Sequence, residues 1–536
     1  MKFSAVIIYE RKKPNMEMLK ENIRLNTAVA AAATQRLVEG DVIVPDTKPD
    51  ILKVLQVDAV SCITDKEVSD GLLRLCGRVD FKILYIPDSE RRCVKSIGAS
   101  FDFEEEIANK DIIASDTAMT ECSVERAEFS LLNSRKLRLK AAVSFDYEII
   151  RVTPVDIAVD IESDASDAGE KACPAPEIKR RTVTLKNSTG MGEFVFPVRG
   201  RAALRSGQSS FGEILKADYS VTDTEYKAMA GRVAAKGTVT VCILYTDADG
   251  ETDHCECELP FTEVWDIEEM TEDSVCDIGY RLEEGGVTIE EDVDGDLREA
   301  AVSVTVTAQL KAAETLELDM IEDCYIPYKE TRLETERAEI TECAASPAMQ
   351  NTIRESIELP EGAPEIASVY NVIAKPHITK VGREGRKLLC EGRLETCVLY
   401  ISESAESPVC SIKKNIPFSY ALECSGGDVN SEPQLKAEIK HIGYSLNSAG
   451  EAELRCILAI NAELERRQTI ELITDVQQCG EAAGRESRIV VYFVRGGDTL
   501  WDIAKHYGVP CGAIIEFNEL DDDTLKTGMR LLIPGK

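Results

Sequence analysis

The sequence lacks the motifs that usually mark a catalytic or metal site. It has no Gly-x4-Gly-Lys-Ser/Thr phosphate loop, no His-Glu-x-x-His and no Gly-x-Ser-x-Gly, and its four histidines lie far apart. None of its 18 cysteines forms a Cys-x-x-Cys pair. The nearest metal-like stretch is His254-Cys255-Glu256-Cys257, which strand packing explains better, because a zinc site normally takes four well-placed ligands. We therefore expect no catalytic residues, no metal and no cofactor.

Long apolar runs and positive charge are also scarce. There is no run of about 18 apolar residues, the length that a membrane-spanning helix needs. The apolar run near the N-terminus is too short for an export signal, so we expect a cytoplasmic chain with reduced thiols. The 62 lysines and arginines are outnumbered by 96 acids, which gives a formal net charge of −34. Nucleic acid and direct membrane insertion are therefore not expected.

What the sequence does contain is a nine-residue motif that occurs three times. Gly77–Tyr85 returns as Gly237–Tyr245 and Gly392–Tyr400, each opening with a glycine and closing with a tyrosine. Alternate residues of a strand share a face, and one face of each copy is apolar apart from Thr396. That face comprises Val79, Phe81, Ile83, Tyr85; Val239, Val241, Ile243, Tyr245; and Leu394, Thr396, Val398, Tyr400. The pattern predicts a half-buried strand of an antiparallel sheet, one in each of three similar domains.

Other landmarks recur around this strand. The Pro45-x3-Pro49 phrase before the first copy returns as Pro360-x3-Pro364 before the third, and a phenylalanine (Phe101, Phe261, Phe418) follows each copy. Each unit closes with a long strand of alternating apolar residues. The predicted fold is therefore mainly β, with three tandem antiparallel β-rich domains and a small C-terminal β-α-α-β domain. The expected boundaries are an N-terminal helix or extension (1–34), β domains at 35–162, 178–328 (divergent) and 335–476, and a last domain at 488–536.

Two segments have helical character on composition alone. Residues 16–38 include an alanine-rich stretch, Ala28–Ala33, and predict a helix. Glu330–Ala345 is a charged connecting segment for which a helix is one option.

The C-terminal fifty residues differ in character from the rest. Val491–Val494 is a predicted strand, and Asp498 or Thr499 is placed to cap a helix whose apolar face is Leu500, Ile503, Ala504 and Tyr507. Gly508 ends this helix and Pro510 begins the next, which has Ile514, Ile515 and Phe517 on its apolar side and Asn518 at a left-handed exit. Leu531–Pro534 is a second strand.

This module resembles a LysM domain. The matching residues are Tyr492, Val494, the Gly497-Asp498-Thr499-Leu500 signature, Ile503, Ala504, Asn518, Gly528 and Leu531–Pro534. The resemblance implies a shallow groove for N-acetylglucosamine-containing glycans, formed by the loops after the first strand and after the second helix. The implied groove residues are Gly497, Asp498, Thr499, Leu500, Trp501, Ile515, Asn518, Glu519 and Leu520. Asp521-Asp522-Asp523 departs from the usual loop sequence, and Trp501 could equally stack on a sugar or shield the small core.

The repeated units resemble SPOCS domains, which occur in spore-coat-associated proteins. The matching residues are Glu39–Pro45 with Lys48–Ile51, the Gly77–Tyr85 strand and its later copies. Tandem SPOCS domains followed by a LysM domain are typical of SipL-like spore coat proteins. The resemblance implies a mother-cell scaffold at the forespore surface, with the coat morphogenetic ATPase (stage IV sporulation protein A) as partner. A peptidoglycan-binding wall protein is the alternative, and a wall hydrolase that LysM targets is the weakest of the three hypotheses.

Overall fold

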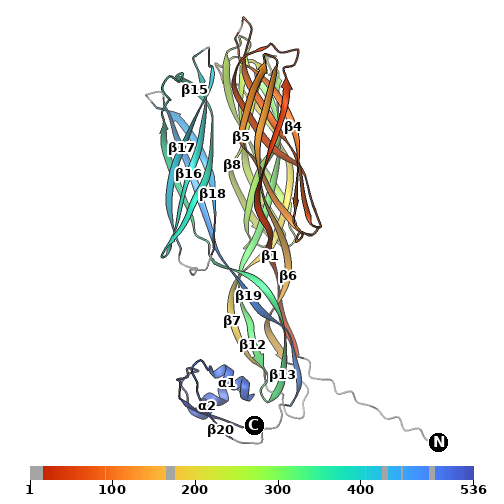
Figure 1. Ribbon diagram of the computed structural model, residues 1–536, viewed down its shortest axis with the longest axis vertical. Coiled ribbons are helices and arrows are strands. Elements are labelled where there is room, and N and C mark those ends of the chain that lie inside the picture. The colour runs from red at the N-terminus through yellow and green to blue at the C-terminus, as the bar shows by residue number, and fades with distance from the viewer. Residues whose placement is uncertain are drawn as a thin grey trace, which may run out of the picture.

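The computed structural model describes residues 16–90, 92–163, 175–404, 406–424, 432–447, 451–481 and 489–535. It has a wide head, a narrow stalk below the head and a small module at the far end of the stalk (Figure 1). Long antiparallel strands build the head and stalk, and the two helices of the described residues both lie in the C-terminal module. The predicted fold class is confirmed.

Three β modules follow one another along the chain. The first consists of β1 (Met16–Ile43), β2 (Ile51–Ser69), β3 (Leu72–Pro87), β4 (Lys95–Ala108), β5 (Thr117–Asn133) and β6 (Lys136–Ser163). The second consists of β7 (Glu177–Ala203), β8 (Phe211–Met229), β9 (Arg232–Asp247), β10 (Thr252–Asp266), β11 (Val275–Glu290) and β12 (Glu299–Tyr325). The third consists of β13 (Lys329–Ala345), β14 (Ala348–Ile357), β15 (Ile366–Glu384), β16 (Lys387–Ser402), β17 (Val409–Glu423), β18 (Glu432–Leu446) and β19 (Ala452–Glu481).

Each module is a sandwich of two sheets around a core of its own. The front sheets are β2-β3-β4, β8-β9-β10 and β15-β16-β17, with the repeated strand in the middle of each. The back sheets contain β1-β6-β5, β11-β12-β7 and β14-β19-β18, and the last two join through a contact between β7 and β13. The predicted apolar face of the repeated strand is buried in all three modules. Thr396, its one polar residue, is also buried and donates its hydroxyl to the Lys414 carbonyl at 2.9 Å.

The tyrosine that closes the repeated strand has a partner in each module. The Tyr85 hydroxyl donates to the Pro49 carbonyl and the Tyr400 hydroxyl donates to the Pro364 carbonyl, both at 3.1 Å. The second module lacks the Pro-x3-Pro phrase, and there the Tyr245 hydroxyl donates to Asp253 at 3.1 Å instead. A buried hydroxyl needs a partner, and the proline motif supplies it in the first and third modules, whereas Asp253 supplies it in the second.

Both predictions of helix outside the C-terminal module are wrong. Residues 16–38 lie in β1, whose Ala30–Ala33 segment pairs residue by residue with β6. Glu330–Ala345 lies in β13, which pairs with β19. In both segments long-range pairing overrides local helix propensity, which is a weak preference.

The glycine that opens the repeated strand makes room for an aromatic ring. The rings above Gly77, Gly237 and Gly392 belong to the directly opposite residues Phe103, Phe261 and Phe418. The structural counterpart of Phe261 and Phe418 in the first module is therefore Phe103, and the ring of Phe101, the phenylalanine noted in the sequence, lies over Gly40.

The long strands of all three modules continue downward and form the stalk. Its apolar core takes side chains from six strands: Ile23, Leu25, Ile157, Val183, Leu185, Leu318, Met320, Ile340, Ile470 and Leu472. A second cluster lies farther along the same strands: Ala158, Ile161, Ile321, Cys324, Ile473 and Val476. Because the buried residues of both clusters come from all three modules, the stalk holds the three modules together at one end.

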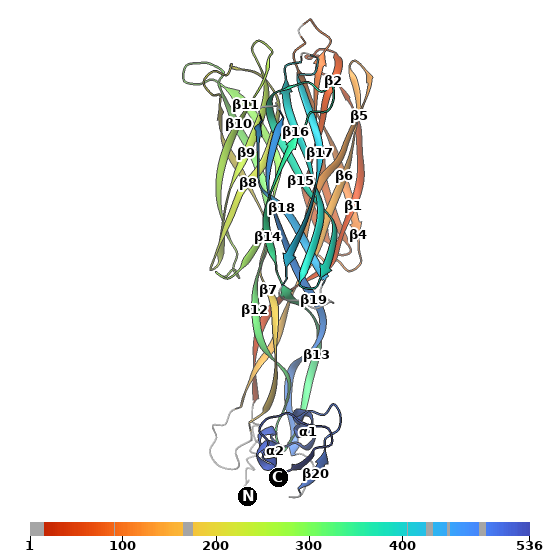
Figure 2. The same cartoon turned by 90° about the vertical axis from the view of Figure 1, so that its left-hand side faces the viewer.

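In the head, the three modules lie side by side along the long axis (Figure 2), and their front sheets share one apolar cluster. The next-to-last residue of each repeated strand, Leu84, Leu244 or Leu399, points out of its own core and into one shared cluster. All three leucines are at most 2 % exposed. The three modules of this one chain are thus arranged around a common centre, as the subunits of a trimer would be.

A buried ion network crosses the centre of this arrangement. Lys216 of the second module lies 2.6 Å from Asp58 of the first module and 2.9 Å from Asp218 on its own strand. Asp218 also accepts hydrogen bonds from Tyr370 and Asn371 of the third module. Burial lowers the pKa of Lys216, but the two carboxylates outweigh burial, so this pKa lies above its usual value. Side chains of all three modules therefore meet at one lysine.

A second ion network joins the first two modules. Glu213 of the second module pairs with Lys48 at 2.9 Å and Lys95 at 2.7 Å, both from the first module. Burial raises the pKa of Glu213, but the two lysines outweigh burial and hold this pKa below its usual range. Glu193 is held by Lys66 and Arg281, and its pKa is lowered in the same way against burial.

Replacing Gly77 with alanine should destabilise the first module. The new Cβ would lie 2.3 Å from the Cys62 carbonyl oxygen and 2.4 Å from the Phe103 ring, so backbone or ring must move. Such overpacking costs about 1–3 kcal/mol. Gly98→Ala on β4 is the control, because its Cβ comes no closer than 3.9 Å to another atom. Thermal unfolding compares the two variants, and equal midpoints would contradict the close-approach explanation.

Replacing Lys216 with alanine should loosen the whole head. Asp58 and Asp218 would lose the cation between them, and breaking a buried ion pair costs about 3–5 kcal/mol. Lys227→Ala, at an exposed lysine of the same strand, should change little. Hydrogen exchange of the three front sheets is the measurement, and we expect faster exchange in all three. Faster exchange confined to the second module would mean that the network does not couple the modules.

Acid should weaken the contact between the first two modules. Glu213 and Glu193 have lowered pKa values in the folded chain, so their contribution is present above about pH 4.5, their ordinary value. It is lost as the pH falls through the folded-state values. Thermal midpoints measured between pH 6 and pH 3 should therefore fall, and Glu213→Gln should reduce that dependence. An unchanged pH profile in Glu213→Gln would rule out this carboxylate as a source.

Candidate functional site

The C-terminal module contains β20 (Val490–Phe493), α1 (Leu500–Tyr507), α2 (Cys511–Asn518) and β21 (Arg530–Ile533). The order of elements is β-α-α-β, and β20 pairs with β21 in antiparallel fashion. Thr499 caps α1: its hydroxyl accepts from the Asp502 amide, and Gly508 ends the helix at a φ of 63°. A compact core forms around Leu500, Ile503, Ala504, Ile514 and Leu531.

Two local predictions in this module need correction. The left-handed residue after α2 is Glu519, with a φ of 53°, whereas Asn518 is the last helical residue. Asn518 serves a different purpose, because its side chain donates to the Ile514 and Leu532 carbonyls and accepts from the Leu532 amide. Phe517, which the sequence placed on the apolar side of α2, is 45 % exposed. The buried side chain of this helix is that of Ile514.

The predicted groove residues divide into core, structural and exposed positions. Leu500 is buried, and Trp501, Ile515 and Leu520 pack against the same apolar cluster, so the structure brings these four together. Gly497, Thr499 and Glu519 are exposed, and Gly497 has a φ of 96°. Asp498 is half-buried.

Hydrogen bonds within the module occupy most of the polar side chains among these residues. Asp498 accepts from the Tyr492 hydroxyl at 2.6 Å and the Arg495 amide at 2.8 Å, and both bonds lower the pKa of its carboxyl. The Thr499 hydroxyl is shared with Asp502, and the Asn518 amide is bound to β21 and α2. A ligand would therefore meet mainly backbone groups, exposed carboxylates and apolar edges at these loops.

The loop after α2 is acidic and exposed. Glu519, Asp521, Asp522 and Asp523 all face solvent, and Asp522 accepts from the Thr524 amide at 2.9 Å. Such a surface attracts cationic groups and repels anionic ones.

The module rests on the tip of the stalk, where β12 turns into β13. Asp323 accepts from the Trp501 indole at 2.9 Å and from the Lys505 ammonium at 2.6 and 2.7 Å. Tyr325 donates its hydroxyl to the Val509 carbonyl at 2.8 Å, and its ring meets Trp501 edge-on at 5.1 Å. Tyr325 thereby belongs to the apolar core of the module.

Sequence reasoning did not identify Asp323, Tyr325 or Tyr328. They lie about 180 residues before their contact partners in the chain, and their pattern is that of a strand end. Tyr328 has a φ of 63°, an uncommon conformation for a large side chain, and its amide donates to the Gly508 carbonyl at 2.8 Å. A single sequence offers no signal for this contact.

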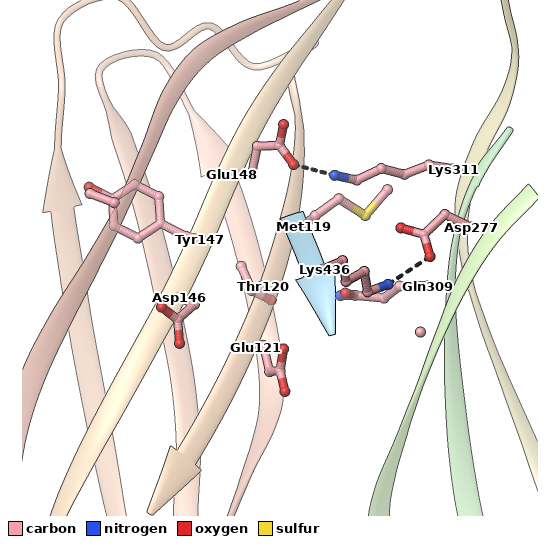
Figure 3. Close-up of a pocket in the computed structure, with 12 residues that line it drawn as sticks. Met119, Thr120, Glu121, Asp146, Tyr147, Glu148, Asp277, Gln309, Lys311 and Lys436 are labelled. Carbon is pink, nitrogen blue, oxygen red and sulfur yellow. Dashed lines mark hydrogen bonds and ion pairs between the residues drawn. The ribbon is translucent and has the colours of Figure 1, made fainter. Parts of the chain in front are cut away.

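A cavity of about 480 Å³ lies where side chains of the three modules converge (Figure 3). It is lined by Ala32, Met119, Thr120, Glu121, Asp146, Tyr147, Glu148, Asp277, Gly279, Gln309, Lys311 and Lys436. Both lysines are paired across module boundaries, Lys311 with Glu148 and Lys436 with Asp277. The cavity is thus a polar junction between modules.

The metal-like stretch at residues 254–257 follows the alternation of β10. Cys255 faces the core, and burial raises the pKa of its thiol to about 12, whereas burial lowers the pKa of His254. Within the described ranges, no group of three or more His, Cys, Asp or Glu side chains is placed to hold a metal ion. None of the described helices is long and apolar enough to cross a membrane.

The fold and the C-terminal site define a multidomain binding protein built on a repeated β module. A family model described as SipL, SPOCS domain matches residues 50–132, 211–290 and 365–447, and one described as LysM domain matches residues 492–534. The chain is therefore a SipL-like protein, with three SPOCS domains followed by a LysM domain. These are binding domains, and their combination is that of a sporulation-related protein with a LysM-type binding module. No curated protein and no solved structure matches the chain.

The SPOCS matches coincide with a definite part of each module. Each covers the front sheet and the one back-sheet strand that directly follows it in the chain: β2–β5, β8–β11 and β15–β18. The long strands that build the stalk lie outside all three matches. The stalk strands therefore flank the matched part of each module in the chain.

Proposed function

We propose that this protein is a non-catalytic scaffold of spore coat assembly. It acts in the mother-cell cytoplasm at the forespore surface and joins a coat morphogenetic protein to the rest of the coat. The coat morphogenetic ATPase (stage IV sporulation protein A) is the proposed partner. The observation that carries the proposal is the architecture: a single LysM domain at one end of a stalk whose other end holds three interlocked SPOCS domains.

The proposed contact surface is the LysM groove. It comprises Gly497, Asp498, Thr499, Leu500, Trp501, Ile515, Asn518, Glu519 and Leu520. Three of these residues shape the surface from within: Leu500 is buried, the Asn518 side chain is bound to β21, and Trp501 is held against the stalk by Asp323. The exposed carboxylates at Glu519 and Asp521–Asp523 favour a partner with basic side chains.

Binding of N-acetylglucosamine-containing glycan is the second candidate, and the LysM match favours it. The backbone N–H and C=O groups around Gly497 could hydrogen-bond to the amide and hydroxyl groups of a sugar, as main-chain groups do in many ligand sites. The exposed acids beside them disfavour anionic peptidoglycan fragments.

Depletion of the protein in its sporulating host tests the proposal directly. The expected result is a coat that fails to surround the forespore, seen by electron microscopy. Purified chain should also retain the coat ATPase rather than muropeptides in a pull-down. A normal coat after depletion would contradict the scaffold function, and retention of muropeptides alone would favour the glycan alternative.

Reversing charge in the acidic loop should weaken partner binding. The double variant Asp521→Lys/Asp523→Lys should reduce affinity for the coat ATPase by about tenfold or more and reduce the association rate, because exposed charges steer encounter. Lys526→Glu, an exposed position of the same loop with the opposite change, is the control and should not weaken binding. Titration of each full-length variant with the coat ATPase measures its affinity. If the double variant bound as tightly as wild type, the contact would lie elsewhere on the molecule.

A further inference from the structure

One carboxylate of the stalk holds the first helix of the LysM domain. Asp323, near the end of β12, accepts three hydrogen bonds, one from the Trp501 indole and two from the Lys505 ammonium. Hydrogen bonds between charged groups are about twice as strong as neutral ones. Asp323 is 23 % and Lys505 40 % exposed in their side chains, so this pair is partly shielded from solvent.

Two tyrosines complete the contact. Tyr325 is only 4 % exposed, and it lies in the LysM core cluster although it belongs to β12. Burial raises the pKa of its hydroxyl, which stays protonated and donates to the Val509 carbonyl. Tyr328 adds a backbone hydrogen bond to Gly508. If the domain moved away, the rings of Tyr325 and Trp501 would be exposed and these polar groups would lose their partners.

The contact uses one side of α1 and its C-terminal end. Trp501 and Lys505 are four residues apart and lie on the same side of the helix, and Gly508 is the residue that ends it. The signature loop, Gly497–Thr499, leads directly into this helix, and Thr499 is its cap. Holding α1 therefore also fixes the direction in which the loop is presented.

We propose that the stalk tip and the LysM domain form one binding unit, in which Asp323 and Tyr325 are positioning residues. They hold α1 so that the groove is presented in a single orientation at the end of the stalk. Trp501 acts through this docking and does not touch the ligand. The docking is independent of any partner, whereas its effect on affinity rests on the proposed function.

The docking is tested first without a partner. In full-length protein, Asp323→Ala should speed hydrogen exchange of the peptide that contains Tyr328 by about tenfold or more, because this amide is bound to Gly508 and a charged hydrogen bond has been removed. Glu317→Ala, which removes an exposed carboxylate from the same strand, is the matched control. In a Trp265→Phe background Trp501 is the only tryptophan, and its emission should shift to the red in Asp323→Ala. Unchanged exchange and emission would overturn the role of Asp323.

The effect on binding is tested with two probes, the coat ATPase and an N-acetylglucosamine-containing muropeptide. Asp323→Ala and Trp501→Phe should each lower the affinity for whichever probe the wild-type protein binds. The double variant should lose no more affinity than the weaker-binding of the two single variants. Exchanging the charges, Asp323→Lys with Lys505→Asp, should restore part of the lost affinity. Additive losses would mean that Trp501 touches the ligand, and full affinity in an undocked variant would mean that docking does not position the groove. If wild type binds neither probe, the proposed function fails, and the exchange and emission results still decide the docking.

Discussion

Burial of one lysine between modules organises the head. Lys216 can be buried only because Asp58 and Asp218 neutralise it, and Asp218 in turn takes hydrogen bonds from the third module. A buried cation without such partners would cost several kcal/mol. Lys216 lies opposite Leu244, and the residues opposite Leu84 and Leu399 in the other modules are Gln56 and Asn371, so the arrangement of the three modules is not symmetric in charge. This asymmetry distinguishes the three modules from one another, although their backbones repeat.

Two apolar regions, the leucines around this network and the core of the stalk, hold the three modules in contact. Leu84, Leu244 and Leu399 bring the front sheets together at the axis, while six strands share the stalk core. Each module has its own core, yet each also buries surface that only its neighbours can cover. The domains are therefore parts of one body, and the LysM domain extends that body through Tyr325 and Asp323.

Much of the fold could be predicted from local pattern. The Gly77–Tyr85 alternation identified the buried face of each central strand, and the helical spacing at Leu500–Tyr507 identified α1. Both signals depend only on which face of an element is apolar. The same local reasoning failed at Ala28–Ala33, because alanine favours a helix in isolation and pairing with β6 decides the outcome. The residues of the candidate site in the LysM domain could be named, but its partner Asp323 could not, since the contact joins positions far apart in sequence.

The path of β19 has a mechanical consequence. This strand of 30 residues runs from the head through the stalk, and the LysM domain follows it in the chain. A pull on the LysM domain along the long axis would load β19 lengthwise against β13, β14 and β18. The interstrand hydrogen bonds run across that direction, so many would have to break together in shear instead of one by one. An attachment made through the LysM domain would therefore resist tension along the molecule far better than peeling from its side.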